Sequence, residues 1–103
     1  MLKLSMSSSV LAAVLFFQFS TAWAADAAQG KIKAQPCVSC HGINGISNSP
    51  EIPNLAGQKE AYLKNALKQY RDGARKNAMM NTFTKPLSDE DIANIAAFFA
   101  AMK

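Results

Sequence analysis

Two cysteines and a histidine stand close together in the run Cys37-Val38-Ser39-Cys40-His41. In a helix, residues three and four apart share one face, so Cys37, Cys40 and His41 can converge on a single flat ligand. The two thiols can add to the vinyl groups of a porphyrin as thioethers, while the imidazole approaches the iron. The CxxCH spacing is the attachment signature of haem c. The sequence therefore predicts one haem held covalently by Cys37 and Cys40, with His41 as an iron ligand.

Other uses of the two cysteines fit less well. A thioredoxin-like CxxC pair needs a βαβ context, which no segment of this sequence offers. A structural zinc site usually has about four ligands, and two cysteines with one histidine supply fewer. A plain disulfide, which an exported chain could form, leaves His41 without a role.

His41 is the only histidine, so two histidines of one chain cannot ligate the iron. The sixth ligand is then a methionine, another weaker donor, water or nothing. Methionine opposite histidine raises the reduction potential and is typical of electron-transfer cytochromes. An open sixth site would instead favour peroxidase-like catalysis or gas binding. The sequence predicts an electron carrier that catalyses no reaction of its own, because no distal histidine or other acid–base pair is evident; a haem-based catalytic or gas-binding domain is the alternative.

The rest of the chain has helical or loop character throughout. Apolar residues at helical spacing predict helices over 26–35, 60–72 and 88–102. Runs rich in glycine, proline or polar residues predict loops over 42–57 and 74–87. Pro36 is expected to end or bend the first helix, and Ser88 with Asp91 predicts a capping-box start for the last. No segment alternates like a strand, so the predicted class is all-α.

Several runs beyond the cysteine motif share a known pattern. They are Gly42 directly after the motif, Pro-Asn-Leu-Ala-Gly-Gln at 53–58, Arg-Lys-Asn-Ala-Met-Met at 75–80 and Leu-Ser-Asp-Glu-Asp-Ile at 87–92. With the motif they resemble class I cytochromes c, in particular short bacterial periplasmic forms with one haem, or one half of the two-haem forms. The resemblance implies a cytochrome c fold, with about three to four helices and their loops wrapped around one haem.

The resemblance also implies further site residues. Its register places the sixth iron ligand at Met80, with Met79 as the alternative and otherwise as a residue packed against the haem. Met102 lies on the apolar face of the last helix, where core packing is expected. In the family, the carbonyl of a loop proline accepts a hydrogen bond from the second nitrogen of the ligating histidine. This position falls on Pro53, with Pro50 as the alternative.

A close crossing of the first and last helices is a further feature of the family. Gly30 lies at the matching place in the first helix, and Phe98 or Phe99 is expected opposite it.

Residues 1–24 read as a secretory signal peptide. Lys3 supplies a positive charge, residues 10–19 are apolar apart from one glutamine, and the small-x-small sequence at 22–24 suits a signal peptidase. The apolar run is too short for a comfortable membrane span, which takes roughly 20 residues. The sequence therefore predicts export to the periplasm.

Cleavage after Ala24 leaves the cytochrome c domain over 25–103, and cleavage after Ala25 is nearly as well supported. A chain of this length forms one domain, and such small domains usually need a staple beyond their side-chain core. A covalent haem would be that staple.

The charge balance is mildly basic, with 11 Lys and Arg against 7 Asp and Glu, a net charge of +4. Nucleic-acid binding is not expected, because no clustered basic face or arm is present. The expected partners are redox proteins, with a dehydrogenase or cytochrome complex as donor and an oxidase or reductase as acceptor. We expect a monomer with no stable membrane insertion once the signal peptide is removed.

Overall fold

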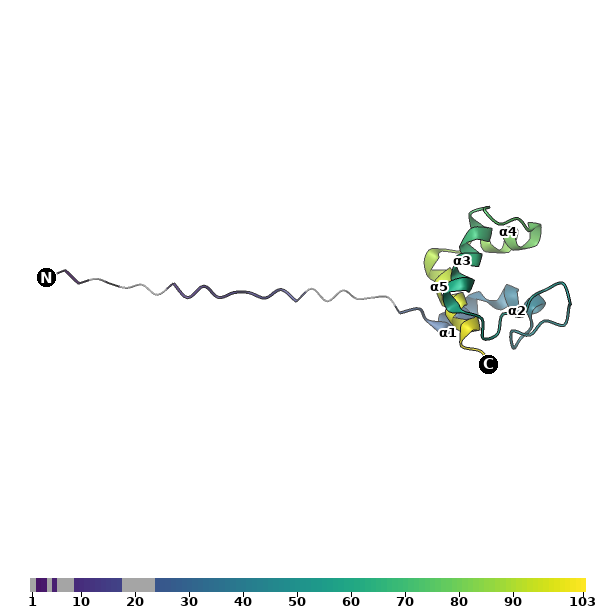
Figure 1. Ribbon diagram of the computed structural model, residues 1–103, viewed down its shortest axis with the longest axis horizontal. Helices are drawn as coiled ribbons and strands as arrows, with labels where there is room; N and C mark the ends of the chain where they lie inside the picture. Colours follow the sequence, from purple (N-terminus) through teal and green to yellow (C-terminus); the bar gives the residue numbers. More distant parts are fainter. Residues whose placement is uncertain (1, 4, 6–8, 18–23) are drawn as a thin grey trace.

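The computed structural model describes residues 2, 3, 5, 9–17 and 24–103. The described residues form five helices and no strand (Figure 1). The helices are α1 (Ala27–Lys33), α2 (Gln35–His41), α3 (Glu60–Arg71), α4 (Ala78–Thr84) and α5 (Asp89–Ala100). The all-α prediction is confirmed, although the structure has five helices where three to four were expected.

The predicted signal peptide is described only in part. Residues 9–17 are exposed and form no helix. Residues 18–23, which hold the end of the apolar run and most of the cleavage sequence, lie outside the described residues. None of the helices in the described part of the chain combines the length and the apolar character that a membrane span requires.

The helix predicted over 26–35 is present as α1 but ends at Lys33, and after a break at Ala34 a separate helix, α2, begins at Gln35. Asp26 caps α1, since its carboxylate accepts hydrogen bonds from the backbone of Ala28 at 2.9 Å and of Gln29 at 3.2 Å. Pro36 lies in the first turn of α2. A proline is tolerated there because that turn has no use for its missing N–H. The bend expected at Pro36 therefore comes two residues earlier, and the cysteine motif occupies a helix of its own.

The capping box predicted for the last helix is present. Ser88 Oγ accepts from the backbone N–H of Asp91 at 3.0 Å, and an Asp91 carboxylate oxygen accepts from that of Ser88 at 3.1 Å. The second predicted helix, over 60–72, is also present as α3, which ends one residue before the expected Asp72.

The loop predicted over 74–87 is wrong in part, because Ala78–Thr84 form α4. Its sequence has no clear apolar period, and a helix this short is marginal without outside support. The support comes from side chains that a periodicity argument does not see. Asn77 caps the helix by accepting from Met80 N at 3.0 Å, and Asn81 donates to two carbonyl groups before the helix, those of Tyr70 and Arg75.

Helix α5 packs against both α1 and α3, and we refer to these three helices as the frame. The buried apolar residues are Ala34, Leu63, Ile92, Ile95, Ala96 and Phe99. All of them lie on the frame helices or at the end of α1, so the core sits where α5 meets its two neighbours. Arg71 joins α3 to the start of α5 by a 2.7 Å ion pair with Asp89. This hydrogen-bonded pairing lowers the pKa of the Asp89 carboxyl from its usual value.

Gly30 allows α1 and α5 to cross in direct backbone contact. A Cβ atom at this position would overlap the carbonyl group of Asn94 and would lie 2.9 Å from Cβ of Phe98. The side chain of Asn94 also accepts from the backbone N–H of Asp26 at 2.8 Å. The expected crossing is therefore present, with Asn94 and Phe98 opposite Gly30.

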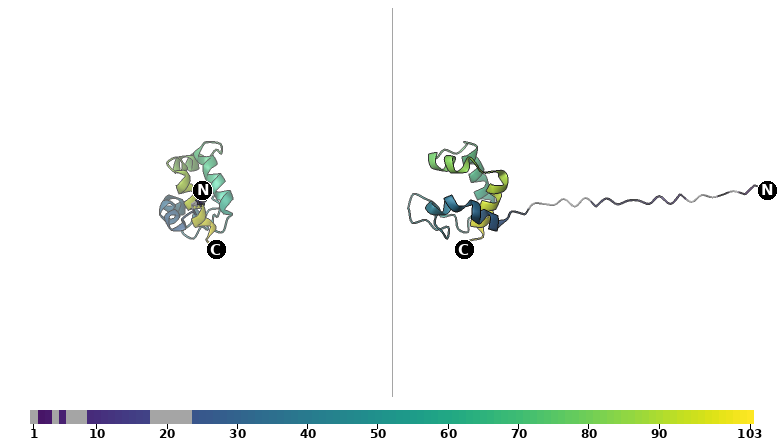
Figure 2. Two further views of the ribbon diagram at one scale, coloured as in Figure 1. Left: turned by 90° about the vertical axis from the view of Figure 1, so that its left-hand side faces the viewer. Right: turned by 180° about the vertical axis from the view of Figure 1, so that it is seen from behind.

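Helices α2 and α4 are attached to the outside of the frame. Helix α2 packs on α1, and α4 packs on α3. Figure 1 and the rear view in Figure 2 both show α2 and α4 on the same side of α5. The cysteine motif and the two candidate methionines thus lie on that side, on separate helices.

Replacing Gly30 tests the helix crossing. Gly30→Ala should lower the free energy of unfolding of the protein by about 3 kcal/mol, because the new methyl group meets backbone atoms that cannot turn away. The gain in helix propensity, about 1 kcal/mol, offsets only part of this loss. Chemical denaturation followed by circular dichroism measures the change.

Gln29→Ala is the matched control, because Gln29 is exposed on the same helix. It should leave stability nearly unchanged. A Gly30→Ala variant as stable as the wild type would contradict the close crossing.

Candidate functional site

Helix α2 carries the cysteine motif at its C-terminal end. Both thiols are free, and both cysteines are partly exposed. Cys37 packs against the core of the frame, which fixes one face of α2. Helix α2 spans the whole motif, so the helical spacing expected for Cys37, Cys40 and His41 is present.

His41 is buried, and one of its ring nitrogens already has a partner. Its Nδ1 atom lies 2.8 Å from the carbonyl oxygen of Pro53. A carbonyl oxygen can only accept, so Nδ1 carries the proton and Nε2 keeps a free lone pair. In metal sites, such a contact from the far nitrogen sets the tautomer and the orientation of a ligating histidine. The geometry thus presents Nε2 as a ligand atom. Pro53, and not Pro50, makes the contact.

The loop after the motif is folded so that Pro53 reaches His41. Gly42 has φ 94°, which a residue with a side chain rarely adopts, and a Cβ here would overlap the Ile46 carbonyl group. Further along, the carbonyl of Gly45 accepts from the backbone N–H groups of Leu55 at 2.8 Å and Ala56 at 3.0 Å. These hydrogen bonds join the part of the loop before Pro53 to the part after it.

Asn54 ties the same loop to itself. Its side-chain oxygen accepts from the backbone N–H of Ser47 at 2.8 Å. The run Pro53-Asn54-Leu55 noted in the sequence therefore supplies three different contacts: a carbonyl for His41, a side-chain acceptor and a backbone donor.

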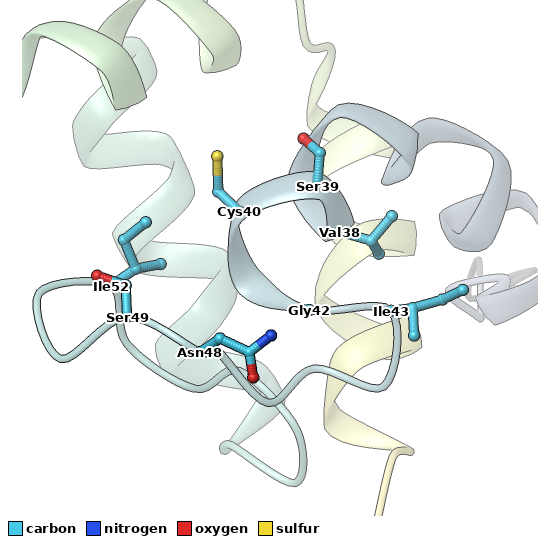
Figure 3. Close-up of a pocket in the computed structure, with 8 residues that line it drawn as sticks. All are labelled: Val38, Ser39, Cys40, Gly42, Ile43, Asn48, Ser49 and Ile52. Carbon is cyan, nitrogen blue, oxygen red and sulfur yellow. The ribbon is translucent and has the colours of Figure 1, made fainter.

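An open pocket of about 490 Å³ lies beside the motif. It is bordered by α2 and by the first half of the loop, at Val38, Ser39, Cys40, Gly42, Ile43, Asn48, Ser49 and Ile52. Figure 3 shows Cys40 on the last turn of α2, with Ile52 to one side of it and Val38 to the other. Cys40 is the only residue of the Cys37–Cys40–His41 set that lines this pocket.

The state of the thiols argues against a disulfide-exchange site. Burial, together with the charge of the nearby Cys40, raises the pKa of the Cys37 thiol. Cysteines that exchange disulfides have a lowered pKa, because the thiolate is the attacking form. Among the described residues, no three His, Cys, Asp or Glu side chains are grouped to hold a bare metal ion. Two free thiols with a histidine that offers Nε2 suit haem c instead.

The two candidate methionines lie next to each other on α4. Met79 is 57% exposed, whereas Met80 is partly buried. The backbone N–H of Met80 donates to Asn77 Oδ1, and its carbonyl oxygen accepts from the hydroxyl of Thr84. Met102 packs against the core of the frame, as expected.

Sequence reasoning missed Asn77 and Asn81, whose side chains hold the helix of the two methionines in place by hydrogen bonds. The position of Asn77 directly before Ala78-Met79-Met80 is a helix-capping signal and could have been read. Asn81 left no signal, because its partners depend on the folded connection between α3 and α4.

Comparison with known proteins identifies the family. The model of the cytochrome c family matches residues 27–103. The chain belongs to the cytochrome c family. The resemblance to class I cytochromes c is thus confirmed, and the cofactor is haem c with its iron, attached through the CxxCH motif that Cys37 and Cys40 fit.

Individual relatives agree with this family. Cytochrome c-554(548) of Halomonas halodenitrificans is 47% identical over 83 residues, which are 78% of this chain and 100% of the relative. A crystal structure of reduced cytochrome c4 from Pseudomonas stutzeri superposes with a TM-score of 0.73 at 39% identity, over 78% of this chain and 47% of that chain.

A third relative is named for its role. The thiosulfate dehydrogenase electron acceptor of Thiomonas intermedia is 37% identical over 90 residues, which are 86% of this chain and 40% of the relative. This chain therefore spans less than half the length of the last two proteins.

Covalent attachment can be tested on denatured protein. Protein made in a host with a cytochrome c maturation system should keep its haem through acid–acetone extraction, because thioether bonds survive denaturation. Its mass should equal the chain from residue 25 or 26 plus one haem, as the predicted cleavage requires.

The Cys37→Ser/Cys40→Ser double variant is the control and should release any haem that it has bound. Wild-type protein without haem, with a Cys37–Cys40 disulfide, would contradict covalent attachment.

Proposed function

We propose that the chain is a soluble electron carrier of the periplasm, with one haem c ligated by His41 and Met80. When bound, haem c supplies a one-electron ferrous–ferric couple. The observation that carries the proposal is the 2.8 Å contact between His41 Nδ1 and the Pro53 carbonyl oxygen, on the helix that holds both cysteines. It prepares the only histidine of the chain to bind iron through Nε2.

Each residue has a separate task in this proposal. Cys37 and Cys40 hold the cofactor, and His41 binds the iron. Pro53 orients the imidazole and increases the electron density at Nε2. The Met80 thioether would be the second protein ligand of the iron, a ligand type that stabilises the reduced form and raises the potential.

Met80 is favoured over Met79 by burial and by backbone contacts. Met79 is 57% exposed, while Met80 is partly buried. The backbone N–H and carbonyl groups of Met80 are both hydrogen-bonded to side chains, those of Asn77 and Thr84. A buried position suits an iron ligand, because water must be kept from the metal.

The proposal extends to export and to partners. Residues 1–24 act as a signal peptide, and residues 25–103 form the mature domain in the periplasm. The carrier takes electrons from a dehydrogenase or cytochrome complex and passes them to an oxidase or reductase. It acts as a monomer, does not bind nucleic acid or stay inserted in a membrane, and catalyses no reaction itself. The relative named as an electron acceptor of thiosulfate dehydrogenase supports a redox enzyme as one such partner.

Two methionine variants test the ligation. Met80→Ala should abolish the weak methionine–iron charge-transfer band in the near-infrared spectrum of the oxidised protein. It should also lower the reduction potential, because the thioether no longer stabilises the ferrous state. Met79→Ala is the matched control on the same helix and should keep both properties.

Two results would contradict this assignment. Loss of the band in the Met79 variant alone would move the ligand by one residue. A wild-type protein without the band, which binds cyanide or peroxide readily, would support the open-site alternative of a catalytic or gas-binding domain.

A further inference from the structure

The side chain of Asn81 makes three hydrogen bonds, each to the backbone of a different residue. Its Nδ2 donates to the carbonyl oxygens of Tyr70 at 2.7 Å and Arg75 at 2.8 Å. Its Oδ1 accepts from the backbone N–H of Asn77 at 2.9 Å. Both amide hydrogens and the carbonyl oxygen are used, so no other side chain of this size makes the same set.

These three partners belong to different parts of the chain. Tyr70 lies in the last turn of α3, where carbonyl groups lack partners within the helix. Arg75 lies in the connection between α3 and α4, and Asn77 is the residue that caps α4. Asn81 therefore fastens the end of α3, the connection and the start of α4 to one another.

The same network continues to Met80. The Asn77 side chain, whose backbone N–H is held by Asn81, accepts from the N–H of Met80 at 3.0 Å. On the other side, Thr84 Oγ1 donates to the Met80 carbonyl at 2.7 Å, and Thr84 is only 2% exposed. The backbone of Met80 is thus tied to α3 through two asparagine side chains.

We propose that Asn81 is a positioning residue that holds Met80 on the iron, an inference that rests on the proposed Met80 ligation. A seven-residue helix has little stability of its own. A thioether–iron bond lasts only while the segment that carries it stays in place, and a poorly supported ligand is lost to local opening. Asn81 supplies that support from α3, which belongs to the frame.

The opening of the Met80 segment can be measured with imidazole as a competing ligand. Imidazole binds the iron only when Met80 has left, so its apparent Kd falls as the open form becomes more populated. The titration is done on the oxidised, haem-loaded protein and is followed by the loss of the methionine–iron band. Thermal unfolding by far-UV circular dichroism is recorded on the same samples.

Asn81→Asp is the principal variant. It keeps the size and the acceptor atom, but loses both donors and sets a carboxylate against two carbonyl oxygens. Two lost hydrogen bonds should lower the apparent Kd for imidazole about tenfold or more. Asn81→Ser, which removes the reach of the side chain without adding a charge, should act in the same direction.

Thr82→Val is the matched control. The Thr82 hydroxyl donates only to Ala78 within α4, at 2.9 Å. This variant weakens the helix locally but leaves its ties to α3 intact, so its Kd should stay within about twofold of the wild type.

The outcomes separate the two proposals. A lower Kd in both Asn81 variants, without a matching fall in the thermal midpoint, supports the positioning role. Three results would overturn it. The Asn81 variants could keep the wild-type Kd for imidazole, Thr82→Val could lower the Kd equally, or the Kd could fall only in step with the thermal midpoint. A wild-type protein that lacks the band would instead overturn the Met80 ligation, and this inference with it.

Discussion

Gly30 brings the backbone of α1 against α5, and the core of the protein forms around this crossing. The side chain of Asn94 on α5 also holds the N-terminal end of α1, through the N–H of Asp26. The apolar residues buried there are few, and two of them are alanines. A domain of this size buries a smaller share of its surface than a large one, so little stability remains for anything attached outside the frame.

The site is built from the parts that are attached outside. Helix α2 with its loop carries the cysteines, His41 and Pro53, and α4 carries Met80, the proposed second iron ligand. They pack on different helices of the frame, α2 on α1 and α4 on α3. Each is fixed by local hydrogen bonds: the loop by the Gly45 carbonyl and Asn54, and α4 by its asparagines. With the proposed Met80 ligation, a haem would be bonded to both helices and would join them, and its apolar surface would add to the small core. Some large side chains on α3 and α4 are about half exposed, among them Tyr62 and Phe83. Such a cofactor can cover this apolar surface.

The sequence predicted best where a feature depends on neighbours in the chain. The CxxCH motif, the capping box of Ser88 and the end of α3 all rest on short-range spacing. The contact of Pro53 with His41, implied by the family resemblance, is also found. Helix α4 was missed because its support comes from Asn81, whose partners meet only after α3 and the connection have folded. The role of Met80 as a ligand stays a prediction, since it depends on the bonded iron and not on the chain alone.

We infer that the frame alone is too small to hold the site and that the covalent haem completes the core. The decisive comparison is far-UV circular dichroism of the exported Cys37→Ser/Cys40→Ser variant beside the haem-loaded wild type. The double variant lacks covalent haem and should show much reduced helicity and little cooperative thermal unfolding, because a cofactor bonded to the native state stabilises only that state. A haem-free variant with native helicity and a sharp transition would contradict this account, since the helices would then pack well enough on one another.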